Sequence, residues 1–285
     1  LNTISAGYPG LSARVAALHR YLLRETPLAR RLVPNDSVPA IADAFAAAAA
    51  RYGQRDARVL MVVQPGETNV FDQRLLEVAL RERGLVTRRL TLEAVAASGR
   101  LREGHLVVDG ERIAIAYFRA AYGPEDYASE AAFRGRALIE ASSAISVPCL
   151  YSQLAGAKKV QQVLADPEVL RRFLAPADAQ AVAACSAAQH DLEQPLPAPG
   201  GSVPAWEWAR AHPADWVLKP QREGGGHNFF DAARVARREA LAPAERPASA
   251  RLAGDATRRR GCALHGVLRG KGCSDARGPR PSLAN

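Results

Sequence analysis

Residues 57–69 read ARVLMVVQPGETN, a run of eight mostly apolar residues followed by a turn. An apolar run of this length is typical of a buried strand. The turn leads into residues 70–83, where apolar side chains recur at helical spacing until Gly84 ends the helix. A second strand is expected at residues 85–92. The order strand, helix, strand predicts an α/β fold.

The next segment adds a hairpin to the same domain. Residues 105–119 read as two strands around Asp109-Gly110, which is a strong turn signal. The alternation of strands with helices over residues 57–150 favours a largely parallel sheet. Ligands bind at the carboxyl ends of the strands in such sheets. We therefore expect a ligand site at residues 64–69 and 119–122.

Outside this region the sequence predicts mostly helices. Apolar residues at helical spacing predict a helix over residues 11–22, and the alanine-rich residues 39–52 predict another. Residues 153–192 are expected to be mostly helical. Residues 195–204, which are rich in Pro and Gly, are interpreted as a linker. An apolar strand is expected over residues 215–220.

The segment around this last strand has the composition of a phosphate-binding loop. Residues 216–228 read WVLKPQREGGGHN. The ammonium of Lys219 can meet phosphate oxygens, and the carboxylate of Glu223 is a hard oxygen ligand suited to Mg²⁺. Three glycines let backbone N–H groups approach a phosphate, although glycine runs alone are also typical of linkers. The order of strand, lysine, glutamate and glycines therefore indicates a polyphosphate–metal site.

Length and composition set the class of protein. A chain of 285 residues with 48% hydrophobic residues can form about two domains with a sizeable core. No apolar run approaches the roughly 20 residues that span a bilayer, and the start lacks the pattern of a signal peptide. Residue 1 is Leu, so we expect a piece of a longer, cytoplasmic protein. The cysteines form no regular framework and are expected to be reduced thiols: Cys149, Cys185, Cys262 and Cys273.

Residues 231–285 differ from the rest of the chain. They carry twelve basic and five acidic residues, which is +7 of the net charge of +9, and they contain no Phe, Tyr or Trp. Such a segment cannot bury enough surface to offset chain entropy, so we expect it to be disordered. Its abrupt start after Phe230 favours out-of-register translation or an unspliced intron over a true basic appendage. Nucleic-acid binding through this tail is an alternative function, although aromatic residues for base stacking are absent.

Five segments, in this order, resemble eukaryotic-type glutathione synthetase, an ATP-grasp ligase. They are NTISA at residues 2–6, NVFDQR at 69–74, YFR with a following Tyr at 117–122, QLAGAKKVQQ at 153–162, and the glycine loop. The resemblance implies a Rossmann-like substrate-binding domain inserted in a partial ATP-grasp domain. The expected divisions are residues 1–56 (an ATP-grasp or N-terminal segment), 57–156 (the substrate-binding domain), 157–230 (an ATP-grasp segment) and 231–285 (the tail).

The resemblance implies a ligase that joins γ-glutamylcysteine to glycine while ATP is split to ADP and phosphate. The dipeptide carboxylate attacks the γ-phosphoryl group, and the glycine amine then displaces phosphate from the acyl phosphate. This chemistry needs positioning and charge neutralisation rather than an enzyme nucleophile. The implied cofactor is Mg²⁺, ATP is the co-substrate, and the family implies a homodimer. The family's chain extends beyond both ends of the resemblance, so we expect this chain to be truncated and inactive alone. The alternative is a non-catalytic fragment that still binds the dipeptide.

The resemblance also assigns residues to the site. The dipeptide would be contacted by Ile4, Ser5, Ala6, Gly7, Glu67, Thr68, Asn69, Gln73, Arg119 and Tyr122. The nucleotide would be held by Lys158, Lys219, Pro220, Gln221, Arg222, Glu223, Gly224, Gly225, Gly226, His227, Asn228 and Phe230. Asn2 and Glu223 would ligate Mg²⁺. Arg119 would pair with a substrate carboxylate, which a planar guanidinium fits better than an ammonium does.

Simpler roles stay open for some of these residues. Arg119 can form a structural ion pair, Tyr122 can be a half-buried packing residue, and Asn2 can be an N-terminal loop residue. The sequence also departs from the family pattern, because Ala120-Ala121 stand where the family has Asp-Gly. Such a difference can alter substrate contacts without destroying the fold.

Overall fold

The computed structural model describes residues 7–54, 56–212, 215–220 and 250–254. The chain forms two compact units, residues 2–155 and residues 156–285, which we call the sheet unit and the C-terminal unit. The division lies one residue before the predicted boundary. Residues 2–56 fall in the same compact unit as residues 57–155. The assignment of residues 1–56 and 157–230 to an ATP-grasp domain stays a prediction.

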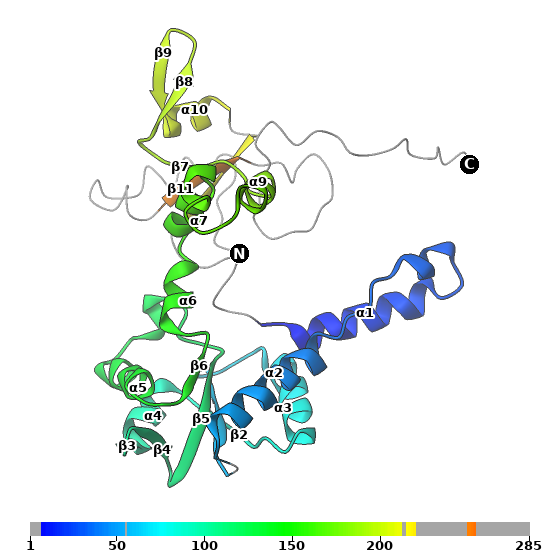
Figure 1. Ribbon diagram of the computed structural model, residues 1–285, viewed down its shortest axis with the longest axis vertical. Helices are drawn as coiled ribbons and strands as arrows, with labels where there is room; N and C mark the ends of the chain where they lie inside the picture. Colours follow the sequence, from blue (N-terminus) through cyan, green and yellow to red (C-terminus); the bar gives the residue numbers. More distant parts are fainter. Residues whose placement is uncertain (1–6, 55, 213–214, 221–249, 255–285) are drawn as a thin grey trace. The chain divides into compact units, whose positions relative to one another are not determined.

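The sheet unit alternates strands with helices, as its sequence predicts (Figure 1). Its strands are β1 (Arg58–Val62), β2 (Thr87–Leu90), β3 (Gly99–Arg102), β4 (His105–Val108), β5 (Glu111–Phe118) and β6 (Ile145–Val147). Its α-helices are α1 (Pro9–Leu23), α2 (Ser37–Tyr52), α3 (Val70–Glu82), α4 (Leu92–Ser98), α5 (Glu130–Glu140) and α6 (Leu150–Ala155). Two 3₁₀ turns are η1 (Pro27–Arg31) and η2 (Pro124–Asp126).

These strands form one sheet in the order β2-β1-β5-β4-β3, and β6 pairs with the second half of β5. β1 is parallel to β2 and β5, and β6 is parallel to β5, whereas the β3–β4 and β4–β5 pairs are antiparallel. The chain leaves β1 through α3 to reach β2, and it then passes through α4, β3 and β4 to β5 on the other side of β1. The strand order therefore reverses between β1 and β5. Open α/β sheets bind ligands in the crevice at such a reversal.

Both faces of the sheet are buried, as the continuous apolar run of β1 requires. Leu60 and Val62 belong to a core with residues of α4 and α5, whereas Val59 and Met61 pack with residues of α2 and α3. Figure 1 shows these helix pairs on opposite sides of the sheet. The unit thus has three layers, helices, sheet and helices, which confirms the predicted mixed α/β fold.

Two caps and one close contact fix α4 and α5. Thr91 and Ser129 are the N-caps, because each hydroxyl accepts a hydrogen bond from the backbone N–H three residues later. Gly135 on α5 lies against the backbone of Leu92 at the start of α4, where an added Cβ would stand 2.8 Å from the Leu92 carbonyl carbon. A glycine is therefore required for the two helices to approach this closely.

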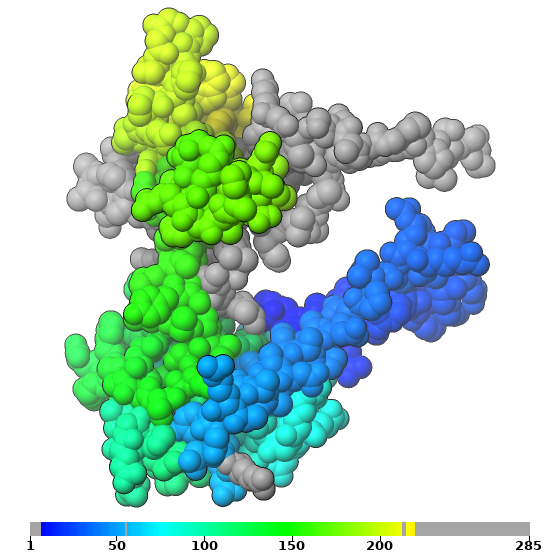
Figure 2. Space-filling model, viewed as in Figure 1, coloured from blue at the N-terminus to red at the C-terminus, as the bar shows by residue number. Residues whose placement is uncertain are grey.

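Among the described residues, helix α1 is anchored mainly at its first turn. Pro9 and Gly10 are its buried residues. Val15, Leu18 and Leu22 share one face and are 50%, 52% and 59% exposed. Figure 2 shows α1 and the η1 turn projecting from the body of the sheet unit. The amphipathic helix is confirmed, but its apolar face is not covered by the residues that the structure describes.

The C-terminal unit contains helices and short antiparallel strands. Its helices are α7 (Lys158–Leu164), α8 (Pro167–Leu170), α9 (Pro176–Ala184) and α10 (Ala205–Ala211). Its strands are β7 (Gln189–Asp191), β8 (Pro195–Ala198), β9 (Gly201–Pro204), β10 (Trp216–Pro220) and β11 (Ala250–Gly254). One sheet has the order β10-β11-β7, and β8 pairs with β9. Leu192 and Leu218 lie in a core beside Trp206, Trp208 and Trp216.

Two expectations for this unit do not hold. The linker expected at residues 195–204 is a hairpin instead, because Gly200 and Gly201 supply positive φ angles of 85° and 147° at the turn. Residues 250–254 fall in the tail for which composition predicts disorder, yet they form β11. Backbone pairing with β10 on one side and β7 on the other holds this strand in place. The other residues of the tail lie outside the described part of the chain.

Candidate functional site

Asp72 and Arg119 form a buried ion pair at the sheet end where the strand order reverses. Arg119 follows β5, and Asp72 lies in the first turn of α3, which follows β1. Their side chains are 0% and 3% exposed, and Arg119 Nη1 donates to Asp72 Oδ2 over 3.0 Å. Ions removed from water need a partner of this kind, because the desolvation of each is costly. The structural ion pair that the sequence left open for Arg119 is therefore part of its environment.

Asp72 also holds the segment that precedes α1. Its Oδ2 accepts a hydrogen bond from the Tyr8 backbone N–H, and its Oδ1 accepts one from the Gly10 N–H, both over 2.8 Å. N–H groups in the first turn of a helix lack backbone acceptors, so a carboxylate is favourable there. This anchor places Gly7 against Arg119, since an added Cβ at Gly7 would stand 2.6 Å from Arg119 Nη2. Gly7 and Arg119, which are both predicted to contact the dipeptide, thus lie side by side.

Tyr117 and Tyr122 lie beside the guanidinium of Arg119. Burial raises the pKa of Tyr122 to about 12, although the charge of Arg119 opposes the shift. Burial also raises the pKa of Tyr117. Burial acts to lower the pKa of Arg119, but the two tyrosines and Asp72 outweigh it, and the pKa is raised. The guanidinium is therefore charged and both phenols are neutral near pH 7.

One donor of the Arg119 guanidinium lacks a partner in the part of the chain that the structure describes. Arg119 Nε is buried and has no hydrogen-bond partner among the described residues. Buried donors are nearly always paired in folded proteins, so an orphan at this position can accommodate an acceptor oxygen of a ligand. Its place at the point of strand reversal agrees with that interpretation.

Glu67, Gln73 and Arg89 form a chain of hydrogen bonds on the same α3 side. Gln73 is fully buried, its Nε2 donates to Glu67 Oε2 over 2.8 Å, and its Oε1 accepts from Arg89 Nη2 over 2.6 Å. Glu67 Oε1 accepts from the Asn69 backbone N–H over 2.7 Å. Both carboxylate oxygens of Glu67 are thus oriented, and Glu67 itself is half-buried. Both ends of the Gln73 amide are engaged, so Gln73 orients Glu67, and its predicted contact with the dipeptide stays a prediction.

Tyr122 connects the two groups of charges. Its phenol interacts electrostatically with both Arg119 and Glu67. The charges of Arg119 and Glu67 thus both act on this half-buried side chain. Thr68, the neighbour of Glu67, is exposed.

Lys158 and Lys219, the lysines predicted for the ATP phosphates, are both buried in the C-terminal unit. Each residue is 7% exposed; Lys158 begins α7 and Lys219 lies in β10. Burial lowers the pKa of Lys158, and no charged group among the described residues contributes to that shift. An ammonium removed from water without a carboxylate beside it is suited to an anionic ligand.

The other predicted residues lie outside the part of the chain that the structure describes. They are Asn2, Ile4, Ser5, Ala6, Gln221, Arg222, Glu223, Gly224, Gly225, Gly226, His227, Asn228 and Phe230. Pro220 ends β10. Within the described ranges there is no group of three or more His, Cys, Asp or Glu side chains that could hold a metal ion. The Mg²⁺ site at Asn2 and Glu223 stays a prediction.

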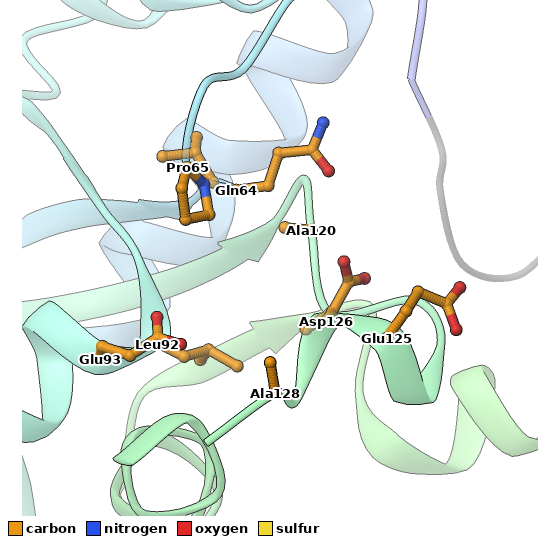
Figure 3. Close-up of a pocket in the computed structure, with 10 residues that line it drawn as sticks. Gln64, Pro65, Leu92, Glu93, Ala120, Glu125, Asp126 and Ala128 are labelled. Atoms are coloured by element: carbon orange, nitrogen blue, oxygen red, sulfur yellow. The ribbon is translucent and has the colours of Figure 1, made fainter. Parts of the chain in front are cut away.

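A pocket of about 320 Å³ opens on the α4 side of the same sheet end. It is lined by residues that follow β1, β2 and β5, with Gln64 and Pro65 across from Asp126 and Ala128 (Figure 3). Its charged side chains are the carboxylates of Glu93, Glu125 and Asp126. Gln64, Pro65, Ala120 and Ala121 fall within the ranges predicted for a ligand site from the strand ends, but none of the residues that the resemblance assigns to the dipeptide or the nucleotide lines the pocket. A pocket with this charge disfavours phosphates and carboxylates, so the α3 side is the better candidate for an anionic ligand.

Three residues of the candidate site were missed in the sequence. Asp72 lies within the NVFDQR segment, but an acidic residue in the first turn of a helix is usually an exposed N-terminal charge. Arg89 is one of two adjacent arginines in β2, and Tyr117 is an apolar-looking strand residue. The signal for Asp72 was its position on the same helix face as the apolar residues Leu75, Leu76 and Ala79.

The three layers define a mixed α/β protein, and the guanidinium of Arg119 and the carboxylate of Glu67 make the end of its sheet the candidate site. A family model described as eukaryotic glutathione synthase, ATP binding domain, matches residues 1–248. The chain belongs to the eukaryotic glutathione synthetase family. The match extends past Phe230, where the sequence resemblance was expected to end, so residues 231–248 are part of the matched region.

Individual relatives agree with this assignment. The chain is 42% identical over 238 residues to chloroplastic glutathione synthetase of Solanum lycopersicum. This match covers 81% of this chain and 42% of the relative. It is 38% identical over 253 residues to glutathione synthetase of Homo sapiens, and this match covers 87% of this chain and 53% of the relative. The chain thus spans about half the length of the curated relatives it matches.

A solved structure supports the fold. The chain superposes on a glutathione synthetase-like effector from Globodera pallida, in its apo form, with a TM-score of 0.65. The match covers 89% of this chain and 54% of the other, at 19% sequence identity. In the described ranges, each helix is too short or too polar to cross a bilayer.

Proposed function

We propose that this chain is part of an ATP-dependent ligase that joins γ-glutamylcysteine to glycine, and that its sheet unit binds the dipeptide. The supporting observation is Arg119, a charged guanidinium that is 5% exposed and whose Nε lacks a partner among the described residues. A side chain of this kind is matched by a carboxylate. The dipeptide of the family reaction carries two.

The chemistry of the α3 side suggests which end of the dipeptide is held there. Glu67 is an oriented carboxylate, so it accepts hydrogen bonds from a cation. The only ammonium of γ-glutamylcysteine is on the glutamyl α-carbon, beside the glutamyl α-carboxylate. Arg119 would bind that carboxylate and Glu67 that ammonium, with Tyr122 between them. An arginine and a glutamate close together are complementary to this zwitterionic head group.

The C-terminal unit would contribute to the nucleotide site. Lys158 and Lys219 would hold phosphate oxygens as point charges, and the residues of the glycine loop would approach with backbone N–H groups. Mg²⁺, when bound by Asn2 and Glu223, would neutralise phosphate charge. The expected arrangement is a substrate-binding domain inserted in an ATP-grasp domain, in a cytoplasmic homodimer.

The proposed reaction has two steps. A cysteinyl carboxylate oxygen forms a bond to the γ-phosphorus as the bond to the bridging oxygen breaks, which releases ADP. The glycine amine then attacks the acyl carbon, loses a proton, and phosphate leaves from the tetrahedral intermediate. Residues of this chain would position the dipeptide and neutralise charge, which is most of what such a transfer requires.

Isothermal titration of the 285-residue chain tests the proposal. γ-Glutamylcysteine is expected to bind. Arg119→Lys is expected to weaken this binding, because a single ammonium cannot replace the paired N–H donors of a planar guanidinium. Gln64→Ala, in the acidic pocket, is the matched control and is expected to bind like the parent. ATP with Mg²⁺ is expected to bind more weakly to Lys219→Met while the dipeptide affinity is unchanged. A folded chain that binds neither ligand would reject the proposal.

Turnover is a separate question. The chain spans about half the length of its relatives, and we expect no glycine-dependent phosphate release from ATP and γ-glutamylcysteine by this chain alone. Release of phosphate that requires glycine would show instead that these residues suffice for catalysis.

A further inference from the structure

Arg89 contacts the candidate site only through other side chains. It lies in β2, its side chain is 15% exposed, and its guanidinium donates to Gln73, to Glu77 and, over 3.5 Å, to the sulfur of Met61. Nη2 donates to Gln73 Oε1 over 2.6 Å, and Nη1 donates to Glu77 Oε1 over 3.1 Å. Glu77, at 12% exposure, anchors one arm of the fork while the other arm reaches the amide.

This contact decides which way the amide of Gln73 points. A guanidinium only donates, so the amide oxygen of Gln73 must face Arg89. The amide nitrogen then faces Glu67 Oε2 and donates to it over 2.8 Å. The reversed amide would set N–H against a guanidinium and an oxygen against a carboxylate, and both contacts would repel. Because Gln73 is fully buried, water cannot compensate for either of them.

We propose that Arg89 is a positioning residue for ligand binding, which acts through Gln73 to hold Glu67 in the orientation that accepts the dipeptide ammonium. This inference rests on the proposed function. Without Arg89, Gln73 can rotate away from Glu67, whose remaining hydrogen bond from a described residue is the one from the Asn69 N–H. A binding carboxylate that must be ordered again for each ligand binds more weakly.

Arg89→Met tests the inference with two ligands that differ in one group. γ-Glutamylcysteine carries the α-ammonium, and glutarylcysteine is the same molecule without it. Arg89→Met is expected to lose about tenfold in affinity for γ-glutamylcysteine, the scale of one hydrogen bond to a charged group, and nothing for glutarylcysteine. Arg88→Met is the matched control, since this neighbour is 54% exposed and pairs with Glu111. It is expected to bind both ligands like the parent.

A second measurement does not depend on any ligand. Hydrogen exchange of the Gln73 side-chain amide, assigned in NMR spectra by its absence in Gln73→Leu, is expected to be slow in the parent and in Arg88→Met. It is expected to be fast in Arg89→Met. The inference is overturned if Gln73 stays protected in Arg89→Met, if the affinity for γ-glutamylcysteine is unchanged, or if both ligands lose affinity equally. If the parent binds neither ligand the proposed function fails, and the exchange rate still decides whether Arg89 fixes Gln73.

Discussion

Gly135→Ala is predicted to destabilise the sheet unit, although alanine is the better helix former. In the middle of α5 this substitution should gain about 1 kcal/mol from helix propensity. The new Cβ would, however, stand 2.8 Å from the Leu92 carbonyl carbon and 3.2 Å from the Leu92 Cα. Non-bonded carbons prefer about 3.5–4.0 Å. One of the two helices must therefore move by roughly 1 Å in a close-packed core.

The steric term is expected to outweigh the propensity. Overpacking of a well-packed core costs about 1–3 kcal/mol and occasionally more, and here the obstacle is backbone that cannot rotate away. We expect a net loss of about 2 kcal/mol in the free energy of unfolding. With a typical urea dependence of about 2 kcal/mol per molar, the midpoint should fall by about 1 M.

The aromatic residues provide a separate signal for each unit. All seven tyrosines lie between Tyr8 and Tyr151, and all three tryptophans lie between Trp206 and Trp216. Urea titration followed by near-ultraviolet circular dichroism of tyrosine reports the sheet unit, while tryptophan fluorescence reports the C-terminal unit. Ala137→Gln, at an exposed position of the same helix, is the control and should change stability by less than about 0.5 kcal/mol. If Gly135→Ala matched or exceeded this control in stability, the close contact between α4 and α5 would be refuted.

Three further substitutions test the charges of the site and of the sheet edge. Lys158→Met should lower the affinity for ATP at least about tenfold. It should also slightly raise the melting temperature, because it removes a buried ammonium whose pKa is lowered by burial. A lower melting temperature would contradict this expectation. Gly7→Ala should weaken γ-glutamylcysteine binding in titration calorimetry, since its Cβ would displace Arg119 Nη2, and unchanged affinity would show that this contact is not needed. The pKa of Glu111 is lowered to about 2 by hydrogen bonds from its two arginine partners, so its contribution to stability exists above the ordinary pKa of 4.5 and disappears as the pH falls toward 2. Glu111→Gln should therefore lower the melting temperature more at pH 7 than at pH 3, and an equal decrease would count against the ion pair.

Local patterns in the sequence were sufficient for several elements of the sheet unit, although they did not predict β3, α5 or β6. The apolar run of β1, the Asp109-Gly110 turn and the Gly84 stop each act within a few residues, and the structure has β1, the β4–β5 hairpin and α3 where they predict them. Periodicity also identified α1, but it could not tell that the apolar face of this helix is left exposed. Exposure depends on which other segments pack there, and a single helix does not contain that information.

The elements that were missed in the C-terminal unit have two different causes. β7 lies within a stretch expected to be mostly helical, and it is a strand because it pairs with β11, about 60 residues further along the chain. The β8–β9 hairpin resembles a linker in composition, since Pro and Gly serve both structures. In the candidate site, the motifs named Glu67, Gln73 and Arg119, but the partners that orient them are Arg89 and Asp72. Hydrogen-bond partners from separate elements leave no spacing signal in a sequence.

A bulge in β5 decides which side of the sheet Arg119 faces. Strict alternation from Ile113 would place residues 115, 117 and 119 on the side of α4 and α5, where Ile113 itself is buried. The pairing of β1 with β5 instead shifts by one residue, from Arg58 with Ile113 to Val59 with Ile115. Ala114 and Ile115 consequently both pack on the α2 and α3 side, and Tyr117 follows them there.

The alternation resumes after this extra residue, so Arg119 meets Asp72 on α3 instead of the acidic pocket beside α4. Had the register continued without the bulge, the guanidinium would have faced the carboxylates of Glu93, Glu125 and Asp126, far from Glu67 and Gly7. Bulges often redirect a side chain at a binding site, and this one requires only that one strand contain one residue more than its neighbour. The position of the candidate site therefore follows from the length of β5 as much as from the identity of the residues at its end.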